Sequence, residues 1–197
     1  MSHPTLSLIA EPKLFEQFLQ LLQKGVKVRA RIGSTVLSFL CDDLGTSPEY
    51  VDKRIQTLFL NGKAIDNPDT ALLTENSTLA LSAAMPGVLG ATLRKGGRYA
   101  RMRSEISYEE QSQRIAVHEG IVLLKLFNLL PAEVGPAVLA RGIWLKGEEL
   151  TQFLKELPDE VVGLCREARL DGQVVDFKSF REKSSRYELV LVRIQRT

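Results

Sequence analysis

The stretch Phe59–Ala83 reads FLNGKAIDNPDTALLTENSTLALSA, and its pattern returns without a gap in Arg169–Arg193, which reads RLDGQVVDFKSFREKSSRYELVLVR. The offset between the two stretches is 110 positions, since 169 minus 59 is 110. Turns and strands demand the residue types that coincide, so the match predicts an internal duplication of one α+β unit. The coincident residues are Gly62 with Gly172, Asp66 with Asp176, Leu79 with Leu189 and Leu81 with Leu191.

The sequence around Phe59–Ala83 predicts the elements of the first half of the chain from its hydrophobic spacing. Asn61-Gly62 is a strong signal for a hairpin turn, and Gly25 is expected to end the first helix. The expected elements are a short edge strand at Thr5–Ala10, a helix from Glu11-Pro12, strands at Val26–Ile32, Ile55–Leu60 and Thr78–Ala83, a helix at Val36–Leu44 and a helical turn at Ser47-Pro48-Glu49.

The second half is expected to follow the same order of elements, with Asp171-Gly172 as its turn. The expected elements are a strongly apolar helix at Ile115–Leu130 that Pro131 ends, a helix at Gly147–Leu157, and strands at Gly142–Leu145, Glu167–Leu170 and Tyr187–Ile194. This order divides the chain into a first repeat at residues 1–84, a Gly-rich basic connecting segment at 85–111 and a second repeat at 112–197.

Residues from Val28 to the Pro86-Gly87 corner resemble the β-grasp sulfur-carrier proteins of thiamin and molybdopterin synthesis. The resemblance lies in a helix (STVLSFLCDDLG), a strand that reaches an N-G turn (LFLNGKAID), a Pro-Asp-Thr step (NPDTALL) and a closing strand (TLALSAAMPG). It implies β-grasp-like, ubiquitin-like sheets. Those carriers work through a free C-terminal Gly-Gly, whereas Gly96-Gly97 lies inside this chain.

Composition and charge describe an ordinary soluble globular chain. Of its 197 residues 44% are hydrophobic and 25% are charged, and the net charge of +2 provides no field that would recruit nucleic acid. No apolar stretch approaches the ~20 residues of a membrane helix, and no signal peptide is expected. Cys41 and Cys165 stand apart from one another and from the histidines, which indicates reduced thiols in a cytoplasmic protein.

The segment Arg94–Arg103 (RKGGRYARMR) is the candidate binding segment, because it has five basic residues and no acidic one. Adjacent glycines expose backbone N–H groups, and arginines bind anions in a bidentate way, so we expect an anion site here. A solvated basic linker is the plainer alternative. Tyr99 could stack on a base. The candidate anion-binding residues are Arg94, Lys95, Gly96, Gly97, Arg98, Arg101 and Arg103.

Other reactive residue types are too scattered to predict catalysis. His3 and His118 are the only histidines, and with two distant cysteines they form no metal-ligand set. We therefore expect no catalytic residue, no metal and no cofactor. A structural role is expected for His118, which the pattern places in an apolar helix.

These observations favour a non-enzymatic binding or interaction protein, whose partner is a protein or an anionic small molecule. Nucleic acid and membrane are not expected partners. The alternative is an enzyme or enzyme subunit that acts on a phosphorylated or carboxylated small molecule at the cleft between the repeats, since such clefts are common ligand sites. A sulfur-carrier relative is the second alternative.

Overall fold

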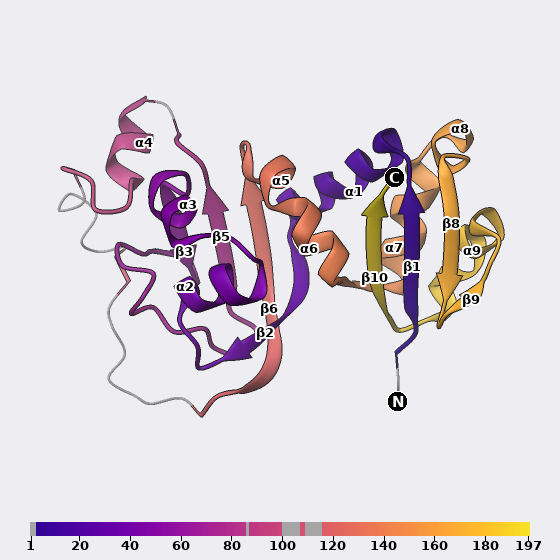
Figure 1. The fold of residues 1–197 in the computed structure, drawn as a ribbon, viewed down its shortest axis with the longest axis horizontal. Coiled ribbons are helices and arrows are strands. Elements are labelled where there is room, and N and C mark those ends of the chain that lie inside the picture. The colour runs from indigo at the N-terminus through magenta and orange to yellow at the C-terminus, as the bar shows by residue number, and fades with distance from the viewer. Residues whose placement is uncertain (1–2, 86, 100–106, 109–115) are drawn as a thin grey trace. The chain divides into compact units, whose positions relative to one another are not determined.

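The computed structural model describes residues 3–85, 87–99, 107–108 and 116–197. Helices and strands are mixed along the chain, which confirms the α+β class expected from the sequence. The chain divides into two compact units, which are described separately (Figure 1). Leu22–Gly135 is termed the continuous unit, and Met1–Leu21 together with Pro136–Thr197 is termed the discontinuous unit.

Strand pairing explains why these units differ from the expected divisions at residues 1–84, 85–111 and 112–197. The N-terminal strand β1 (Thr5–Ala10) pairs with β8 (Cys165–Leu170) and with β10 (Leu189–Arg196). The N-terminal strand therefore belongs with the C-terminal part of the chain. Conversely β6 (His118–Phe127), which lies in the expected second repeat, pairs with β2 (Val26–Ile32) and completes the continuous unit.

In its described residues, the continuous unit is built on five strands in the order β4-β3-β5-β6-β2. Strands β5 and β6 are parallel, and the other neighbouring pairs are antiparallel. Besides β2 and β6, its elements are α2 (Val36–Ser38), a π-helical turn η1 (Phe39–Asp43), α3 (Pro48–Lys53), β3 (Thr57–Leu60), β4 (Lys63–Ala64), β5 (Thr78–Ser82), α4 (Gly87–Leu93) and α5 (Leu130–Glu133).

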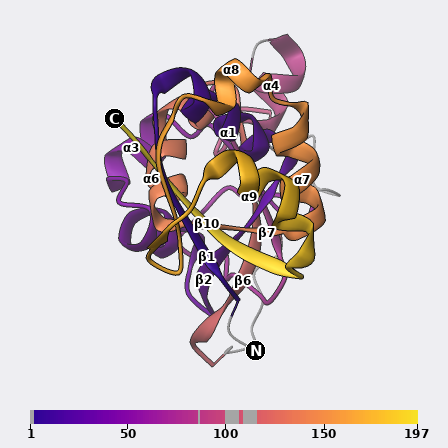
Figure 2. The ribbon, with the colours of Figure 1, turned by 90° about the vertical axis from the view of Figure 1, so that its right-hand side faces the viewer.

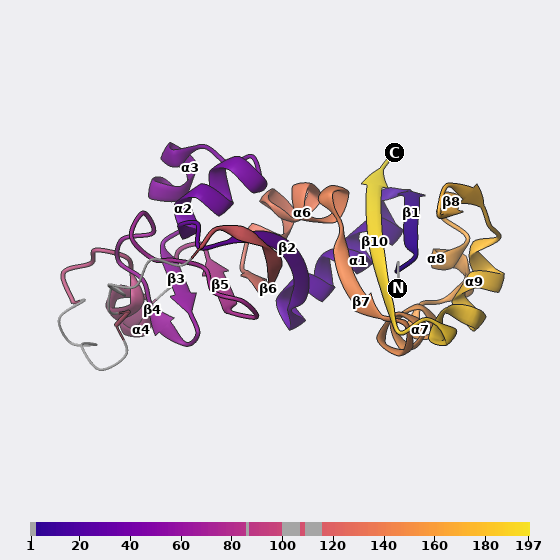
Figure 3. The ribbon, with the colours of Figure 1, turned by 90° about the horizontal axis from the view of Figure 1, so that it is seen from below.

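Alternating side chains give the strands of the continuous unit one core face. Leu58 and Leu60 of β3 are buried, as are Leu79 and Leu81 of β5. Figure 3 shows α2 and α3 on one side of these strands and α4 on the other. The expected helix at Val36–Leu44 is divided between α2 and the π-helical turn.

The discontinuous unit also has five strands, in the order β7-β10-β1-β8-β9. Strands β1 and β10 run parallel and side by side (Figure 2), and the other neighbouring pairs are antiparallel. Its remaining elements are α1 (Pro12–Lys24, which ends in the continuous unit), α6 (Gly135–Arg141), β7 (Ile143–Lys146), α7 (Gly147–Glu156), α8 (Asp159–Val162), β9 (Gln173–Val174), α9 (Phe177–Lys183) and the 3-10 turn η3 (Ser184–Arg186).

The two units share one sequence of strand directions. Starting from β4 in the continuous unit and from β9 in the discontinuous unit, the successive pairs of neighbouring strands are antiparallel, antiparallel, parallel and antiparallel. The hairpins agree in register at the offset of 110, since Leu60 pairs with Lys63 and Leu170 pairs with Gln173. Gly62 and Gly172 both have a positive φ, at 79° and 82°, as an N-G or D-G turn requires.

The closing strands of the two stretches occupy different places, contrary to the gap-free match of Leu79 with Leu189. Strand β5 pairs directly with β3, but β10 does not pair with β8, because β1 lies between them. Leu60 faces Leu79 in one unit, and Leu170 faces Leu6 in the other. The two stretches therefore correspond in their hairpins and not over their whole length.

The expected helix at Ile115–Leu130 is wrong, because residues His118–Phe127 form strand β6. Val122, Leu124 and Leu126 are buried, while the residues between them are partly exposed. A short apolar run such as IVLLKLF fits a buried helix as well as a buried strand. Pairing with β2 and β5 on both sides makes it a strand.

Candidate functional site

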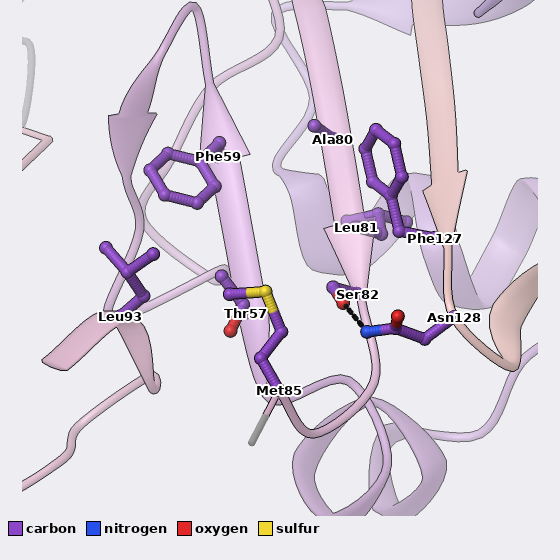
Figure 4. Close-up of a pocket in the computed structure, with 9 residues that line it drawn as sticks. All are labelled: Thr57, Phe59, Ala80, Leu81, Ser82, Met85, Leu93, Phe127 and Asn128. Atoms are coloured by element: carbon purple, nitrogen blue, oxygen red, sulfur yellow. Dashed lines mark hydrogen bonds between the residues drawn. The ribbon is translucent and has the colours of Figure 1, made fainter. Parts of the chain in front are cut away.

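A pocket of about 360 Å³ in the continuous unit is the candidate functional site (Figure 4). The polar lining residues are Thr57, Ser82 and Asn128. None of the lining residues that the structure describes has an acidic or basic side chain, so this described lining is neutral as well as largely apolar. The apolar lining residues are Phe59, Ala80, Leu81, Met85, Leu93 and Phe127.

Strand register gathers five of the lining side chains on one face. Thr57 pairs with Ser82 across β3 and β5, and Phe59 pairs with Ala80. Ser82 in turn pairs with Phe127 across β5 and β6. Because paired residues share a face and successive residues alternate, these five side chains lie opposite the buried leucines of the core. The small Ala80 and Ser82 leave the space between the two phenylalanines (Figure 4).

Ser82 and Asn128 form the hydrogen-bonded corner of the pocket. The Asn128 side-chain Nδ2 donates to Ser82 Oγ at 2.6 Å (Figure 4). Asn128 follows β6 directly and has a φ of 58°, a left-handed conformation that asparagine tolerates better than most residues. The turn after β6 therefore aims a carboxamide back at β5. Ser82 Oγ accepts this bond and keeps its own proton for another acceptor.

Thr57 carries a hydroxyl that is buried without a hydrogen bond. The residue is 2% exposed, and Oγ1 has no partner among the residues that the structure describes. More than about 90% of buried polar groups in proteins are hydrogen-bonded, so such an exception requires an explanation. Leaving a hydroxyl unpaired costs about 1–3 kcal/mol.

Met85 and Leu93 complete the pocket from the segment that follows β5. Gly90 in α4 packs so closely on the Met85 backbone that a Cβ atom there would lie 1.9 Å from the Met85 carbonyl oxygen. Glycine is therefore required at this contact, which sets the position of Met85. Figure 4 shows the Met85 side chain extending toward Thr57. A methionine side chain is flexible enough to move aside for a ligand.

Lys95, one of the residues expected to bind an anion, fastens the segment that forms this wall. Its backbone N–H donates to the Gln56 carbonyl at 2.7 Å. Its side-chain Nζ donates to the carbonyls of Val51 and Asp52 at 2.9 and 3.2 Å, at the C-terminal end of α3. Only 11% of the Lys95 side chain is exposed. The ammonium group therefore serves internal acceptors that a helix C-terminus provides.

Gly96 continues this internal attachment. Its backbone N–H donates to Asp66 Oδ1 at 2.8 Å. A second pocket, of about 330 Å³, lies here and is lined in part by Asp52, Asp66, Lys95 and Gly96. The structure thus brings together two of the expected anion-binding residues, and it places two carboxylates beside them.

Of the other expected anion-binding residues, Arg94, Gly97 and Arg98 line neither pocket. Arg94 and Arg98 are exposed, and Gly97 N–H donates to the Arg94 carbonyl at 3.0 Å. Tyr99, expected to stack on a base, is 49% exposed. Arg101 and Arg103 lie outside the described residues.

A charged cluster outside the pockets joins α3 to α5. Glu133 accepts hydrogen bonds from Arg54 and from the Tyr50 hydroxyl, the latter at 2.6 Å. These bonds, that of Arg54 above all, lower the pKa of Glu133 to about 2. Burial and the Glu133 carboxylate raise the pKa of Tyr50. The cluster keeps Glu133 ionised and is suited to holding two helices together.

Both cysteines are free thiols with raised pKa values. Burial raises the pKa of Cys165 to about 11 and also raises that of Cys41. A thiol of this kind is a poor nucleophile near neutral pH. Within the described ranges, no group of three or more His, Cys, Asp or Glu residues is placed to hold a metal ion. No described helix has the length and apolar character needed to cross a membrane.

The chain was compared with known proteins at three levels. No protein-family model, no curated protein sequence and no solved structure matches it.

Sequence reasoning did not identify the pocket residues. One pattern was available: Thr78–Ser82 (TLALS) places leucines on one face of β5, and Ala80 and Ser82 on the other. Small residues on the second face of a strand leave space for a ligand or for another segment. The remaining contributors, Met85, Leu93 and Asn128, come from segments whose return to β5 no local pattern predicts.

Proposed function

We propose that this chain is a non-enzymatic binding protein built from two related β-grasp-like units, and that the pocket of the continuous unit is its binding site. The observation that carries the proposal is the neutral, apolar character of a pocket with one polar corner, at Thr57, Ser82 and Asn128. Small-molecule sites are mostly apolar with a few placed polar groups.

Common descent of the two units is supported by their shared strand directions and by the hairpin register. It is further supported by one detailed contact. Asn61 accepts from the Thr78 N–H and donates to the Thr78 carbonyl, at 2.8 and 2.9 Å. Asp171 makes the same two bonds with Thr5, both at 2.8 Å. In a duplicated ancestor, β1 would have taken the place beside β8 that β5 holds beside β3.

The chemistry of the lining supports binding over catalysis. Its two hydroxyls, on Thr57 and Ser82, have no histidine, lysine or carboxylate among the other described lining residues to act as a general base. A hydroxyl without such a base is a weak nucleophile. Its natural use in an apolar pocket is to fix a ligand by hydrogen bonding.

Lys95 and Gly96 contribute to this function by fastening the pocket wall. Their contacts with α3, Gln56 and Asp66 hold the chain that leaves α4, and α4 provides Leu93 to the pocket. In this proposal, Lys95 and Gly96 of the basic segment Arg94–Arg103 form a structural clamp through these contacts.

Isothermal calorimetry with ethylbenzene as the probe tests the proposed function. The wild type should bind the probe, and Ala80→Leu, which fills the pocket, should reduce the affinity at least tenfold. Ala132→Leu is the matched control, because it makes the same change at an exposed position of α5. Equal affinity in all three proteins would overturn the proposal, as would a wild type that binds neither ethylbenzene nor acetophenone.

A further inference from the structure

The buried hydroxyl of Thr57 specifies the chemistry of the ligand more closely than the apolar walls do. Its Oγ1 is unpartnered among the described residues although the residue is 2% exposed. Thr57 lines the pocket directly, as does Ser82, its partner across β3 and β5. An unpaired donor at the wall of an apolar pocket indicates that a hydrogen-bonding partner is supplied from outside the chain.

The polar corner offers two hydroxyl protons. The Thr57 hydroxyl makes no hydrogen bond with any residue that the structure describes. The Ser82 oxygen accepts from Asn128 at 2.6 Å, which leaves the Ser82 proton available. Two donors on one face of neighbouring strands match an oxygen with two lone pairs. A carbonyl oxygen has this form.

Charge and size limit the rest of the ligand. A charged group in this pocket would lose its hydration without meeting an opposite charge on the described lining residues, which is costly. A pocket of about 360 Å³ lies at the lower end of the usual range for ligand sites, roughly 300–1,000 Å³. Phe59 and Phe127 present aromatic surface on either side of Ala80 (Figure 4). A single ring with a short substituent suits this space.

On the basis of the proposed function, we propose that the pocket takes a compact, neutral carbonyl compound, whose apolar body lies between Phe59 and Phe127 and whose oxygen accepts from the Thr57 hydroxyl. The flexible Met85 side chain moves aside when the ligand enters. The acceptor then satisfies a donor that is otherwise buried without a partner, and this raises affinity for carbonyl compounds over hydrocarbons of the same shape.

A pair of probes isolates this hydrogen bond. Acetophenone and ethylbenzene have nearly the same shape, and a carbonyl in the first replaces a methylene in the second. Their dissociation constants are measured with the full chain by titration monitored by NMR. In Thr57→Val, which removes the hydroxyl and keeps the shape, the acetophenone affinity should fall by about 3- to 10-fold. The ethylbenzene affinity should stay the same or increase.

A second variant guards against a general loss of packing. Thr57→Ser keeps the hydroxyl and removes the methyl group. It should therefore lower the affinity for both probes by the same factor and preserve the preference for acetophenone. If Thr57→Val changes both affinities equally, the carbonyl assignment is wrong while the pocket remains a binding site. If the wild type binds neither probe, the proposed function itself is wrong, and so is the assignment of a carbonyl ligand.

Discussion

The carboxylate of Asp66 accepts a hydrogen bond from the backbone N–H of Gly96 at 2.8 Å. The adjacent Lys95 donates to the carbonyls of Val51 and Asp52 at the end of α3. A Gly-Gly step flanked by basic residues suggests an external anion when only the sequence is considered. In the structure, the first of these glycines binds a carboxylate of the same chain, and this contact lies next to the chain that forms the pocket wall.

Replacing Lys95 by methionine should loosen that wall. The substitution keeps the length of the side chain and removes the charge-assisted hydrogen bonds to α3, so the free energy of unfolding should fall by about 1–2 kcal/mol. The affinity for ethylbenzene should fall as well, because Leu93 lies only two residues before the clamp. Chemical denaturation and calorimetry measure the two effects.

Arg98→Met is the control for this prediction, since Arg98 is exposed and lines neither pocket. Its stability and its ethylbenzene affinity should match those of the wild type. Identical behaviour of the Lys95 and Arg98 variants would show that the clamp does not support the pocket.

Two buried threonines should respond in opposite ways to the same substitution. The Thr57 hydroxyl has no partner within the described part of the chain, so Thr57→Val should leave stability unchanged or raise it by up to about 1 kcal/mol. Thr151 donates to the Gly147 carbonyl at 2.8 Å and contacts Ser184 Oγ at 2.6 Å. Thr151→Val breaks both contacts and should cost about 1 kcal/mol or more. Urea denaturation of both variants gives the comparison, and a loss of stability in Thr57→Val would mean that its hydroxyl is satisfied.

Glu133 should stabilise the protein in a pH-dependent way. Its hydrogen bonds with Arg54 and Tyr50 lower its folded-state pKa from 4.5 to about 2. A lowered acid pKa gives stability that is fully present above about pH 5 and is lost as the pH falls toward 2. Because the pair is partly exposed, the contribution should be at most about 1 kcal/mol.

Glu133→Gln isolates this contribution. The difference in the free energy of unfolding between the wild type and the variant should be largest near neutral pH and should shrink steadily between pH 5 and pH 2. Glu148→Gln, at an exposed position of α7, makes the same change of charge and is the matched control. A constant difference for Glu133→Gln across this range would contradict the assigned pKa.

The strand order predicts which fragments fold. Residues 22–135 contain all five strands of the continuous unit, so this fragment should unfold cooperatively in urea. Residues 112–197, the second repeat expected from the sequence, lack β1, which lies between β10 and β8. That fragment should stay unfolded until a peptide of residues 1–24 is added. Cooperative unfolding of residues 112–197 alone would contradict the observed pairing.

Local residue patterns predicted most of the secondary structure. The alternation in Val26–Ile32, the Asn61-Gly62 and Asp171-Gly172 turns, and the helix beginning at Gly147 all appear as expected. These features depend on residues that are close together in the sequence, so the sequence alone predicts them. The pattern of Ile115–Leu130 predicts a helix where the structure has a strand. A short apolar run can form either one, and its partners in the fold decide which.

The arrangement of strands and the pocket depend on such distant partners. Leu6 and Leu79 face equivalent leucines, at positions 170 and 60, although they lie at opposite ends of the first 80 residues or so. No offset along the chain equates them. Asn128 reaches Ser82 only because β6 runs parallel to β5. The register between strands therefore decides which side chains line the pocket. In the sequence, the only sign of the pocket is the pair of small residues on one face of β5.

Intermolecular NOEs between ethylbenzene and the methyl groups of the wild type test the pocket most directly. The account predicts NOEs from the ring protons to the Met85 methyl and to the methyl groups of Leu93, both of which line the pocket. Val190, buried in the discontinuous unit, should give none. NOEs spread over exposed methyls such as Val174, or none to Met85 and Leu93 at saturating probe, would contradict the central claim.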